Sequence, residues 1–455
     1  MVSARGSYKQ PDGKLISATI AAESLATPVI SEVSFDGDFF ADDDLGGDAS
    51  LAPVECALSG SPLTWSLQDY QERIAAAIPA NLHLEGTDVR ALALAVRRAA
   101  GKLVGGQADE SVASAGVASE AGAGKKPGLP QDAFDTGNLT SSNLSWDELK
   151  RRWNSLDLAI VEPQTSAQQP FDPAMQMAVD EVIAERTRKG EMPALIRFWE
   201  WASPAVIIGL FQSLSAEVNM QAARERGITV VRRITGGGAM FVEPGNTITY
   251  SLTVPRDFIE GLNSEDAYRL CEAWAIGALR SVGIKAAHAP LNDVVSPAGK
   301  IGGAAQRRYP KSEAGAVLAR GVAAGTGASG AVLPGTGVAR AVSSGAVLPG
   351  TELPGAVLHH TTMAYDIDAV AMTQVLRPHQ EKLAAHAVKS AAKRVDPMKS
   401  QSGMSRREIM EAMARYAHEF VPGLRSYQLP EDVLKEAREL AQSKYSNPEW
   451  TGRIA

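Results

Sequence analysis

Short apolar runs in the second half of the chain have the composition of buried strands. They are rich in β-branched and aromatic residues, each is only a few residues long, and Gly or Pro lies nearby, as is typical of strands. Their sequences are ALIRFW at 194–199, AVIIG at 205–209, ITVVR at 228–232 and TITYSL at 247–252. We therefore predict a strand at each of these positions.

Apolar positions at helical spacing predict helices between and after these strands. Asp172 followed by Pro173 has the sequence of a helix start, with Asp172 as N-cap and Pro173 at the first helical position. Ser264 can cap a second helix, the sequence at 405–408 (SRRE) has the spacing of a capping box, and Pro430 is expected to open the last helix. The elements do not follow a strict βαβ alternation, so we expect an α+β fold with a mixed sheet and not a Rossmann fold.

Two segments are poor in large side chains. Residues 103–143 are rich in Gly, Ala and Ser and cannot offset their own ordering entropy by burial, so we predict a flexible linker. Residues 314–358 repeat the sequence GAVL and are predicted to form a surface loop, either a lid or, as we favour, a functionally neutral insertion. The predicted organisation is a small domain at 1–102, the linker, and a larger domain at 144–455 that contains the loop.

The composition excludes several classes of protein. The chain of 455 residues has 45 Lys and Arg against 52 Asp and Glu, a formal net charge of −7, which excludes a polybasic nucleic-acid binder. Its two cysteines, Cys56 and Cys271, have no disulfide or metal-binding spacing, and Cys271 falls among the apolar positions of a predicted helix, as a core residue would. There is no run of about 18 apolar residues and no apolar signal sequence, so we expect a cytoplasmic protein.

The stretch RRITGGGAMFVEPGN at 232–246 is the first candidate for substrate binding. Three consecutive glycines, Gly236 to Gly238, remove every Cβ from a turn between two predicted strands, so backbone N–H groups can approach an anion closely. Arg232 and Arg233 add donors suited to phosphate or carboxylate. The spacing matches neither a P-loop nor a dinucleotide-binding fingerprint. From these residues alone, an anion-binding turn and a glycine-rich hairpin with solvated arginines are equally supported.

Lys300, in NDVVSPAGKIGGAAQRR at 292–308, is the second candidate. The small residues at 302–305 leave room for a substrate beside its ammonium group, which could hold a phosphate or a developing oxyanion. Taken alone, a Gly-Lys pair is more often the tip of a hairpin. His359 and His360 are adjacent on a predicted strand and point to opposite faces, so at most one of them can face a shared pocket.

Taken in order, these stretches resemble the lipoate-protein ligase family, whose catalytic fold is shared with biotin ligases and octanoyl transferases. The family's motifs are an Arg-rich strand that runs into a Ser/Thr-Gly-Gly-Gly-Ala turn, an Asn-Asp pair, a Gly-Lys segment with small residues, and a His-Gly-Thr strand. Their counterparts here are RRITGGGA at 232–239, the pair Asn292 and Asp293, GKIGGAAQ at 299–306, and HTT at 360–362. PAMQMAVDE at 173–181 and EKLAAHAVKSAAKRV at 381–395 resemble further family segments. Thr361 replaces the family's Gly, and Leu291 replaces an Arg that often precedes the Asn-Asp pair.

The N-terminal residues resemble the small accessory domain of the same ligases. The similar stretches are YKQPDGKLISATI at 8–20, FDGDFF at 35–40 and ALSGSPL at 57–63. In many members this domain follows the catalytic domain, whereas here it precedes it. The resemblance therefore implies a mixed-sheet biotin/lipoate-ligase-like catalytic domain with a small α+β accessory domain in permuted order.

The resemblance implies an ATP-dependent lipoate-protein ligase. Such an enzyme converts lipoate and Mg-ATP to lipoyl-AMP and pyrophosphate, then transfers the lipoyl group to a lysine of a lipoyl acceptor domain. The implied partners are the acceptor domains of 2-oxoacid dehydrogenase complexes or the glycine cleavage H protein, with neither nucleic acid nor membrane.

The same resemblance assigns site residues. Lys300 and Asp293 are implied to be catalytic, and Asp293 either orients Lys300 or helps to hold Mg²⁺. The residues implied to bind nucleotide and lipoate are Arg233, Thr235, Gly236, Gly237, Gly238, Ala239, Met240, Phe241, Asn246, Gly303, Ala304 and His360. For the apolar tail of lipoate, the candidates are Val206, Ile208, Met240 and Phe241, each of which could equally be a core residue.

Three alternatives remain at this point. An octanoyl or lipoyl transferase on the same fold passes the acyl group through a cysteine thioester, and Cys271 would have to be that nucleophile. A biotin ligase is less well supported because its GRGRxG-type loop is absent. A non-catalytic lipoyl-binding protein is opposed by the presence together of Lys300, Asp293 and the three glycines.

Overall fold

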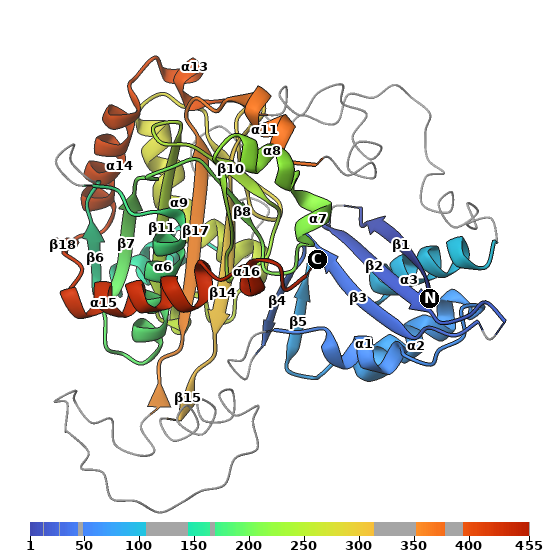
Figure 1. The fold of residues 1–455 in the computed structure, drawn as a ribbon. Coiled ribbons are helices and arrows are strands. Elements are labelled where there is room, and N and C mark those ends of the chain that lie inside the picture. The colour runs from blue at the N-terminus through green and yellow to red at the C-terminus, as the bar shows by residue number, and fades with distance from the viewer. Residues whose placement is uncertain are drawn as a thin grey trace, which may run out of the picture.

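The chain forms two domains that lie side by side (Figure 1). The computed structural model describes residues 1–11, 13–26, 28–43, 49–105, 144–163, 169–313, 352–377 and 395–454. The small domain ends near residue 105 and the large domain begins at residue 144. The predicted linker start at residue 103 falls on the end of helix α3 (Val89–Leu103), whereas residues 106–143 and nearly all of the segment 381–395 lie outside the described residues.

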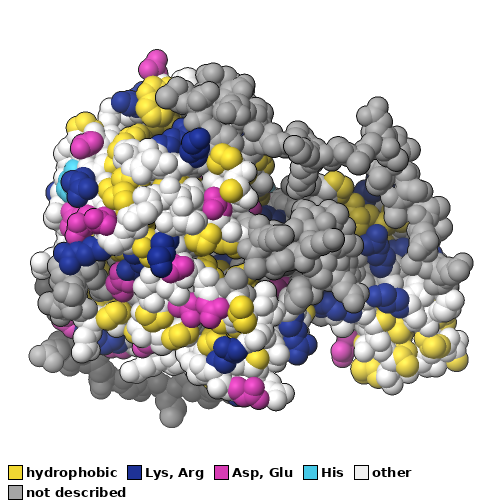
Figure 2. Space-filling view, turned by 90° about the horizontal axis from the view of Figure 1, so that it is seen from above, with side chains coloured by type: hydrophobic (Ala, Val, Ile, Leu, Met, Phe, Trp, Pro, Cys, Tyr) yellow, Lys and Arg dark blue, Asp and Glu magenta, His cyan; other side chains and the backbone are white. Residues whose placement is uncertain are grey.

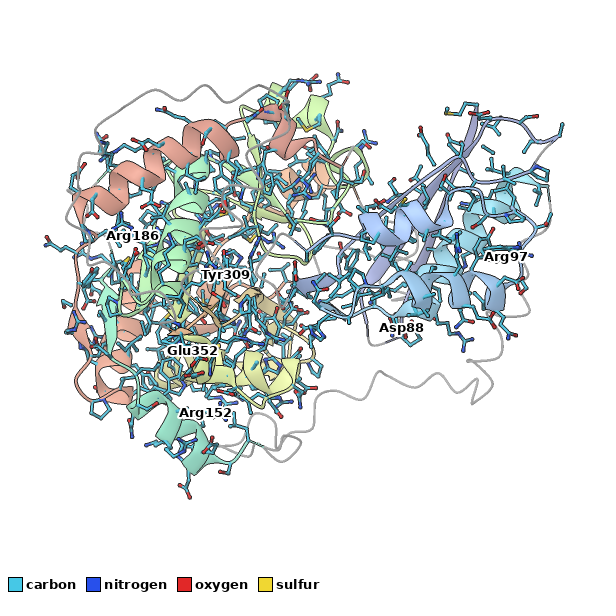
Figure 3. All side chains as sticks on the ribbon, turned by 90° about the horizontal axis from the view of Figure 1, so that it is seen from below. Asp88, Arg97, Arg152, Arg186, Tyr309 and Glu352 are labelled. Carbon is cyan, nitrogen blue, oxygen red and sulfur yellow. The ribbon has the colours of Figure 1, made fainter. Side chains whose placement is uncertain are left out.

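The small domain packs one antiparallel sheet against helices. Its sheet has the order β1-β2-β3, and a separate two-stranded antiparallel sheet pairs β4 with β5. Asp88, labelled in Figure 3, caps the long helix α3 by accepting the N–H of Ala91. A Cβ at Gly6 would lie 2.3 Å from the carbonyl oxygen of Ala95, so the glycine lets this helix lie close against the sheet. The elements are β1 (Val2–Lys9), β2 (Leu15–Ala22), β3 (Glu32–Gly37), β4 (Phe40–Asp43), α1 (Ala52–Leu58), α2 (Leu67–Ala77), β5 (Leu82–Glu85) and α3 (Val89–Leu103).

An eight-stranded mixed sheet forms the centre of the large domain. Its order is β12-β13-β14-β17-β11-β7-β6-β18, with β6 parallel to both β7 and β18 and the other pairs antiparallel. A second sheet has the order β10-β8-β9. The predicted α+β class is therefore confirmed, as are the four predicted strands, which are β7 (Ala194–Trp199), β8 (Ala205–Ile208), β9 (Thr229–Arg232) and β11 (Thr247–Val254). The other strands are β6 (Leu158–Val161), β10 (Met240–Val242), β12 (Ala287–Ala289), β13 (Asp293–Val295), β14 (Lys300–Tyr309), β17 (Ala356–Ala364) and β18 (Arg425–Ser426).

Helices cover both faces of the large sheet, and alternate residues of each strand supply the two cores. In β7, Ile196 and Phe198 pack with α5, α9 and α14, whereas Leu195 and Trp199 pack with α6 and α15. Arg186 of α6, labelled in Figure 3, forms ion pairs with Asp432 and Glu436 of α15. The helices are α5 (Trp146–Asn154), α6 (Pro173–Arg188), α9 (Ser264–Ser281), α14 (Arg406–Phe420) and α15 (Glu431–Leu440), with shorter ones at α7 (Leu214–Glu217), α8 (Met220–Glu225), η2 (Arg256–Ile259), α11 (Ala369–Val375), α13 (Met398–Ser402), η4 (Ala441–Tyr445) and α16 (Pro448–Thr451).

Most of the predicted helix starts are confirmed. Asp172 caps α6 with Pro173 in its first turn, and the capping box of α14 is present. Ser264 was predicted as a cap, but the structure makes it the first helical residue, because the extended Asn263 accepts the N–H of Asp266 instead. Pro430 does precede α15, although η4 and α16 follow that helix.

The predicted GAVL loop is shorter than 314–358 at its C-terminal end. Residues 314–351 lie outside the described residues, but β16 (Glu352–Leu353) pairs with β15 (Ser312–Glu313), and β17 begins at Ala356. Leu358 is fully buried in the central sheet. The last GAVL repeat is thus part of the core, because its Ala, Val and Leu residues have the size and branching that a strand requires.

The two domains meet through a closely packed interface. The rings of Phe39 and Phe211 stack with centroids 4.7 Å apart, and Phe211 belongs to the core of the small domain. Arg308 of β14 donates to the Glu85 carboxylate at 2.6 Å. Its backbone N–H donates to Asp42, whose pKa burial raises to about 6 in spite of the nearby guanidinium. The small domain is therefore held to the large one by apolar and ionic contacts.

The surface has side chains of both charge signs. On the face seen in Figure 2, Lys and Arg alternate with Asp and Glu over the described part of the chain. None of the described helices is long and apolar enough to cross a membrane.

Candidate functional site

A cavity of about 360 Å³ lies where the two domains meet. Its walls include the glycine turn between β9 and β10, the β13–β14 hairpin, the strand β17, the segment around α11, and the small domain. Segments far apart in the sequence therefore share one cavity, and its lining includes both polar and apolar side chains.

The glycine turn is shaped by close backbone contacts. Gly237 has φ +89°, a conformation that L side chains rarely adopt. A Cβ at Gly236 would lie 2.6 Å from the carbonyl oxygen of Phe39 in the small domain. A Cβ at Gly209 would lie 2.0 Å from the carbonyl oxygen of Gly237. The glycines thus serve both the turn and the packing of the small domain against it.

Neither arginine before this turn is solvated. Arg232 is fully buried, and its guanidinium donates to backbone carbonyls that include those of Gly209, Gln212 and Thr451. Burial lowers the pKa of Arg232 to about 9 and that of Arg233 to about 10. Arg232 therefore ties the C-terminus of the chain to β9, which excludes the solvated hairpin as an interpretation of this stretch.

Arg233 belongs to a buried chain of hydrogen bonds behind the turn. It donates to the carbonyl oxygens of Gly236 and Gly238 at 2.6 and 2.9 Å and to the hydroxyl of Thr235 at 2.9 Å. That hydroxyl lies 2.8 Å from Nε2 of His360, whose Nδ1 lies 3.3 Å from the carboxylate of Asp180 in α6.

The protonation state of His360 in this series of hydrogen bonds follows from the groups on either side of it. Burial lowers the pKa of His360, although Asp180 opposes that effect, so the imidazole is neutral. The ionised carboxylate can only accept, so Nδ1 carries the hydrogen and Nε2 accepts from the hydroxyl of Thr235. Asp180 is also paired with buried Arg197 at 2.7 Å. Hydrogen bonds thus connect the turn to β17 through His360 and to α6 through Asp180, and they hold the turn in one position.

Lys300 and Asp293 face this turn across the cavity. They lie on adjacent strands of the hairpin, and Nζ of Lys300 donates to Oδ1 of Asp293 at 2.7 Å. Burial alone would raise the pKa of Asp293, but the ammonium groups of Lys300 and Lys14 hold it below its usual value. A Cβ at Gly303 would lie 3.1 Å from Nζ of Lys300, so the small residue leaves the space that the ammonium occupies.

The small domain supplies two side chains that the sequence interpretation did not assign to the site. Lys14, at the start of β2, donates to Oδ1 of Asn292 at 2.6 Å. Asp38 follows β3 and accepts from Gln212 at 2.9 Å. Both line the cavity. In the sequence, the stretches that contain Lys14 and Asp38 indicate only an accessory domain, because no local pattern shows that their side chains reach this cavity.

Part of the cavity lining is apolar. Met240 and Phe241, predicted to contact an apolar tail, line it together with Ile367, Met372 and Leu376. Val206 and Ile208, the other two candidates, are fully buried in the core around β8 and are not among the lining residues. The lining of the cavity thus combines charged groups with apolar side chains.

The structure brings most of the predicted site residues together. The predicted residues that line the cavity are Lys300, Asp293, Arg233, Gly237, Gly238, Ala239, Met240, Phe241, Gly303, Ala304 and His360. Thr235 lies behind the turn, Gly236 faces the small domain, and Asn246 lies at the start of β11, where it donates to Glu243 at 3.0 Å. His359 points to the opposite face of β17, into hydrogen bonds with Gln306 and Thr361.

Neither cysteine of the chain lines the cavity. Cys56 is exposed on α1 of the small domain. Cys271 is fully buried in α9, where burial and the neighbouring Glu272 raise the pKa of its thiol. A thiol in such surroundings is not a reactive nucleophile.

The donor groups of the cavity fit a magnesium ion that arrives with a nucleotide. Among the described residues, no group of three or more His, Cys, Asp or Glu could hold a metal ion. Mg²⁺ in nucleotide sites usually takes one or two carboxylates and completes its shell with phosphates and water. Asp38 and Asp293 line the cavity and match that number.

Residues 172–317 match the family model of the lipoyl protein ligase A/B catalytic domain. This matched stretch lies within the large domain and is similar to that family. The matched stretch includes the glycine turn, Asp293 and Lys300, and it ends before β17.

The relatives that this chain matches carry two kinds of name. An octanoyltransferase LipM of Moorella thermoacetica is 35% identical over 134 residues, which are 29% of this chain and 44% of that protein, so the chain spans less than half of this relative's length. The lipoate-protein ligase A subunit 1 of Thermoplasma acidophilum is 27% identical over 282 residues, 62% of this chain and 92% of that protein. A solved structure of the bipartite lipoate protein ligase and its E2 lipoyl domain from T. acidophilum covers 66% of this chain and 96% of its own, with 25% identity and a TM-score of 0.48.

Proposed function

We propose that this protein is an ATP-dependent lipoate-protein ligase. It activates lipoate as lipoyl-AMP and transfers the lipoyl group to a lysine of a lipoyl acceptor domain. The observation that carries the proposal is the single cavity whose lining brings together the pair of Lys300 and Asp293, the glycine turn and several apolar side chains. A molecule with an acidic head and an apolar tail matches this combination.

The first step would join the lipoate carboxylate to the α-phosphate of ATP. A carboxylate oxygen forms a bond to the α-phosphorus, and the bond from that phosphorus to the bridging oxygen breaks, so that pyrophosphate leaves with the electron pair. Negative charge accumulates around the phosphorus, and Lys300 can offset it. Backbone N–H groups of the turn add fixed donors, because the chain of hydrogen bonds from Asp180 holds the turn in place. A magnesium ion, when bound through Asp293 or Asp38, would shield the charge of the phosphates.

The second step would form the amide. The ε-amine of the acceptor lysine attacks the lipoyl carbonyl, the bond to the adenylate oxygen breaks, AMP leaves, and the amine loses a proton. The acceptors would be lipoyl domains of 2-oxoacid dehydrogenase complexes or the glycine cleavage H protein, and the reaction would take place in the cytoplasm.

An octanoyl transferase is the second candidate, favoured by the name of the M. thermoacetica relative. Acyl transfer through a thioester needs a thiolate at the acyl group. The two cysteines of this chain are an exposed one outside the cavity and a buried one with a raised pKa. The chemistry of the described site therefore supports the ligase.

The deciding experiment is an assay of lipoate transfer to an apo acceptor domain with and without Mg-ATP. We expect transfer and pyrophosphate release only with ATP. Lys300→Ala should lower the rate by about 100-fold to 1000-fold, the cost of removing a group that stabilises transition-state charge. Lys311→Ala is the matched control, because Lys311 follows the opposite end of β14, does not line the cavity, and is also paired with carboxylates, those of Asp257 and Glu260. ATP-independent transfer from an octanoyl thioester would refute the ligase.

A cysteine variant separates the two candidates a second time. Cys271→Ala removes the buried thiol and should leave ATP-dependent transfer within about twofold, at a stability cost of about 1 kcal/mol for a small core truncation. Loss of all activity in a variant that remains folded would support a thioester route.

A further inference from the structure

Lys14 is a cation of the cavity that forms no ion pair within the described part of the chain. Among the described residues, its ammonium has one hydrogen bond, to the amide oxygen of Asn292, and no carboxylate lies within ion-pair distance. Lys300 is paired with Asp293, and Arg233 is bonded to carbonyls and a hydroxyl. An ammonium has three donors, so Lys14 retains donors for a further acceptor.

The position of Lys14 is fixed by the backbone of the small domain. Its own N–H donates to the carbonyl of Gly86 at 2.6 Å, and its carbonyl accepts from Gln10 at 3.2 Å. The next residue, Leu15, accepts from the N–H of Asp38 at 2.9 Å. Nζ also lies 5.5 Å from the ring centroid of Phe40. The side chain is therefore held at the interface and is not a loosely placed surface lysine.

The surroundings of Lys14 favour an anionic ligand. Burial lowers its pKa to about 8, while Asp293 and Asp38 oppose that effect and Lys300 and Lys9 add to it. A partly buried ammonium whose bonded partner is a neutral amide gains stability when a counter-charge is supplied. A phosphate oxygen would supply it through a charge-assisted hydrogen bond.

We infer that Lys14 is a phosphate-binding residue, which the small domain contributes to the nucleotide site of the large domain. The inference rests on the proposed function only in naming the phosphate as part of ATP. Lys14 is separated by 278 residues from its partner Asn292, so the nucleotide site is complete only when both domains are docked.

The test compares Lys14→Met and Lys14→Arg with wild type in the full chain. Loss of one charge-assisted hydrogen bond should raise KM for ATP in lipoate-dependent pyrophosphate exchange by about tenfold to hundredfold in the Met variant. The Arg variant, which keeps the charge, should recover most of the loss. Transfer from chemically prepared lipoyl-AMP to an acceptor domain should change by less than the ATP-dependent step.

Lys102→Met is the control, because Lys102 is an exposed lysine of the same domain that donates to the carbonyl of Arg5. It removes the same charge away from the cavity and should match wild type. Unchanged ATP dependence in a folded Lys14→Met variant overturns the inference, as does an Arg variant that is as impaired as the Met variant.

Direct binding keeps this test independent of the reaction. Inorganic pyrophosphate, titrated calorimetrically into each protein, should bind about tenfold or more weakly to Lys14→Met than to wild type and Lys102→Met. If wild type makes no lipoyl-AMP but this difference remains, the proposed function fails and the phosphate site stands. Equal pyrophosphate binding by all three proteins refutes the phosphate site whatever the reaction.

Discussion

Two groups of polar and charged side chains, one behind the glycine turn and one on the β13–β14 hairpin, differ in burial and in hydrogen bonding. The group behind the glycine turn is buried, with no member more than 8% exposed, and each member forms a hydrogen bond or ion pair with another. Its members are Asp180, Arg197, Thr235 and His360. On the hairpin side, the side chains of Lys300 and Asp293 are 45% and 32% exposed. They form one hydrogen-bonded ion pair with each other.

We expect this difference to distinguish residues that position the turn from residues that take part in the proposed reaction. A buried ion pair with every donor satisfied resists movement, because breaking any part of it leaves an uncompensated charge. A half-exposed ammonium can change partners at little cost, as a group must when it neutralises transient charge. We therefore expect changes behind the turn to alter mainly stability, and changes on the hairpin to alter mainly rate.

The largest effect is expected at Asp180. Asp180→Asn leaves the guanidinium of Arg197 buried without its counter-charge and should lower the free energy of unfolding by about 3 to 5 kcal/mol. The carboxylate's pKa is lowered in the folded state, against burial, by Arg197 and His360. Its contribution is therefore complete above its usual pKa of 3.8, and the difference between wild type and variant should shrink as the pH falls below that value.

Urea unfolding at pH 7 and at pH 3.5 measures both parts of this prediction. Glu185→Gln is the control on the same helix, since Glu185 forms a partly exposed ion pair with Arg188 and should cost less than about 1 kcal/mol. Equal losses in the two variants would contradict the distinction between the buried and the exposed pair.

Thr235 should show a smaller loss. Thr235→Val keeps the shape but removes the hydroxyl that accepts from Arg233 and donates to His360, and unsatisfied buried groups cost about 1 to 3 kcal/mol. Thr235→Ser should restore most of the stability. Chemical denaturation of the three proteins decides the point, and a Ser variant no better than the Val variant would show that the hydroxyl is not responsible.

Gly303 tests the hairpin side. In Gly303→Ala, the new Cβ would lie 3.1 Å from Nζ of Lys300 and 3.5 Å from Oδ1 of Asp293, so the ammonium must shift. Because that contact is the flexible end of a side chain, we expect less than about 1 kcal/mol of stability loss but about a tenfold lower kcat/KM in lipoyl-AMP formation.

The neighbouring glycine provides the contrast. A Cβ at Gly302 would lie 2.4 Å from the backbone oxygen of Thr362, so Gly302→Ala should mainly destabilise the sheet. Thermal denaturation together with pyrophosphate exchange separates the two variants. A Gly303→Ala protein with full activity would argue against the placement of Lys300 at the reacting groups.

The smallest effect is expected at Asn246. The family resemblance implies a binding role, but Asn246 lies outside the residues that line the cavity and donates to Glu243. Asn246→Ala should therefore leave KM for ATP within about twofold, at a cost of about 1 kcal/mol for one hydrogen bond. A large rise in KM would extend the nucleotide site beyond the cavity.

Local patterns predicted much of the fold. The runs ALIRFW and TITYSL are central strands, and Asp172 and the pair Ser405 and Glu408 start helices, because strand composition and capping depend on neighbouring residues. Asn263 replaced Ser264 as a cap because both side chains can accept there and backbone geometry chooses between them. The last GAVL repeat was assigned to a loop because repetition hid its strand composition.

The sequence by itself determined the kinds of chemistry present: a turn without side chains, a lysine among small residues, and only two cysteines. Only the tertiary structure decided which groups meet. It turned Arg232 into a buried anchor for the C-terminus, placed Thr235 behind the turn, and brought Lys14 from the other domain into the cavity. The physical reason is that burial and charge pairing are properties of contacts between distant segments, which packing of the two domains creates and no local pattern contains.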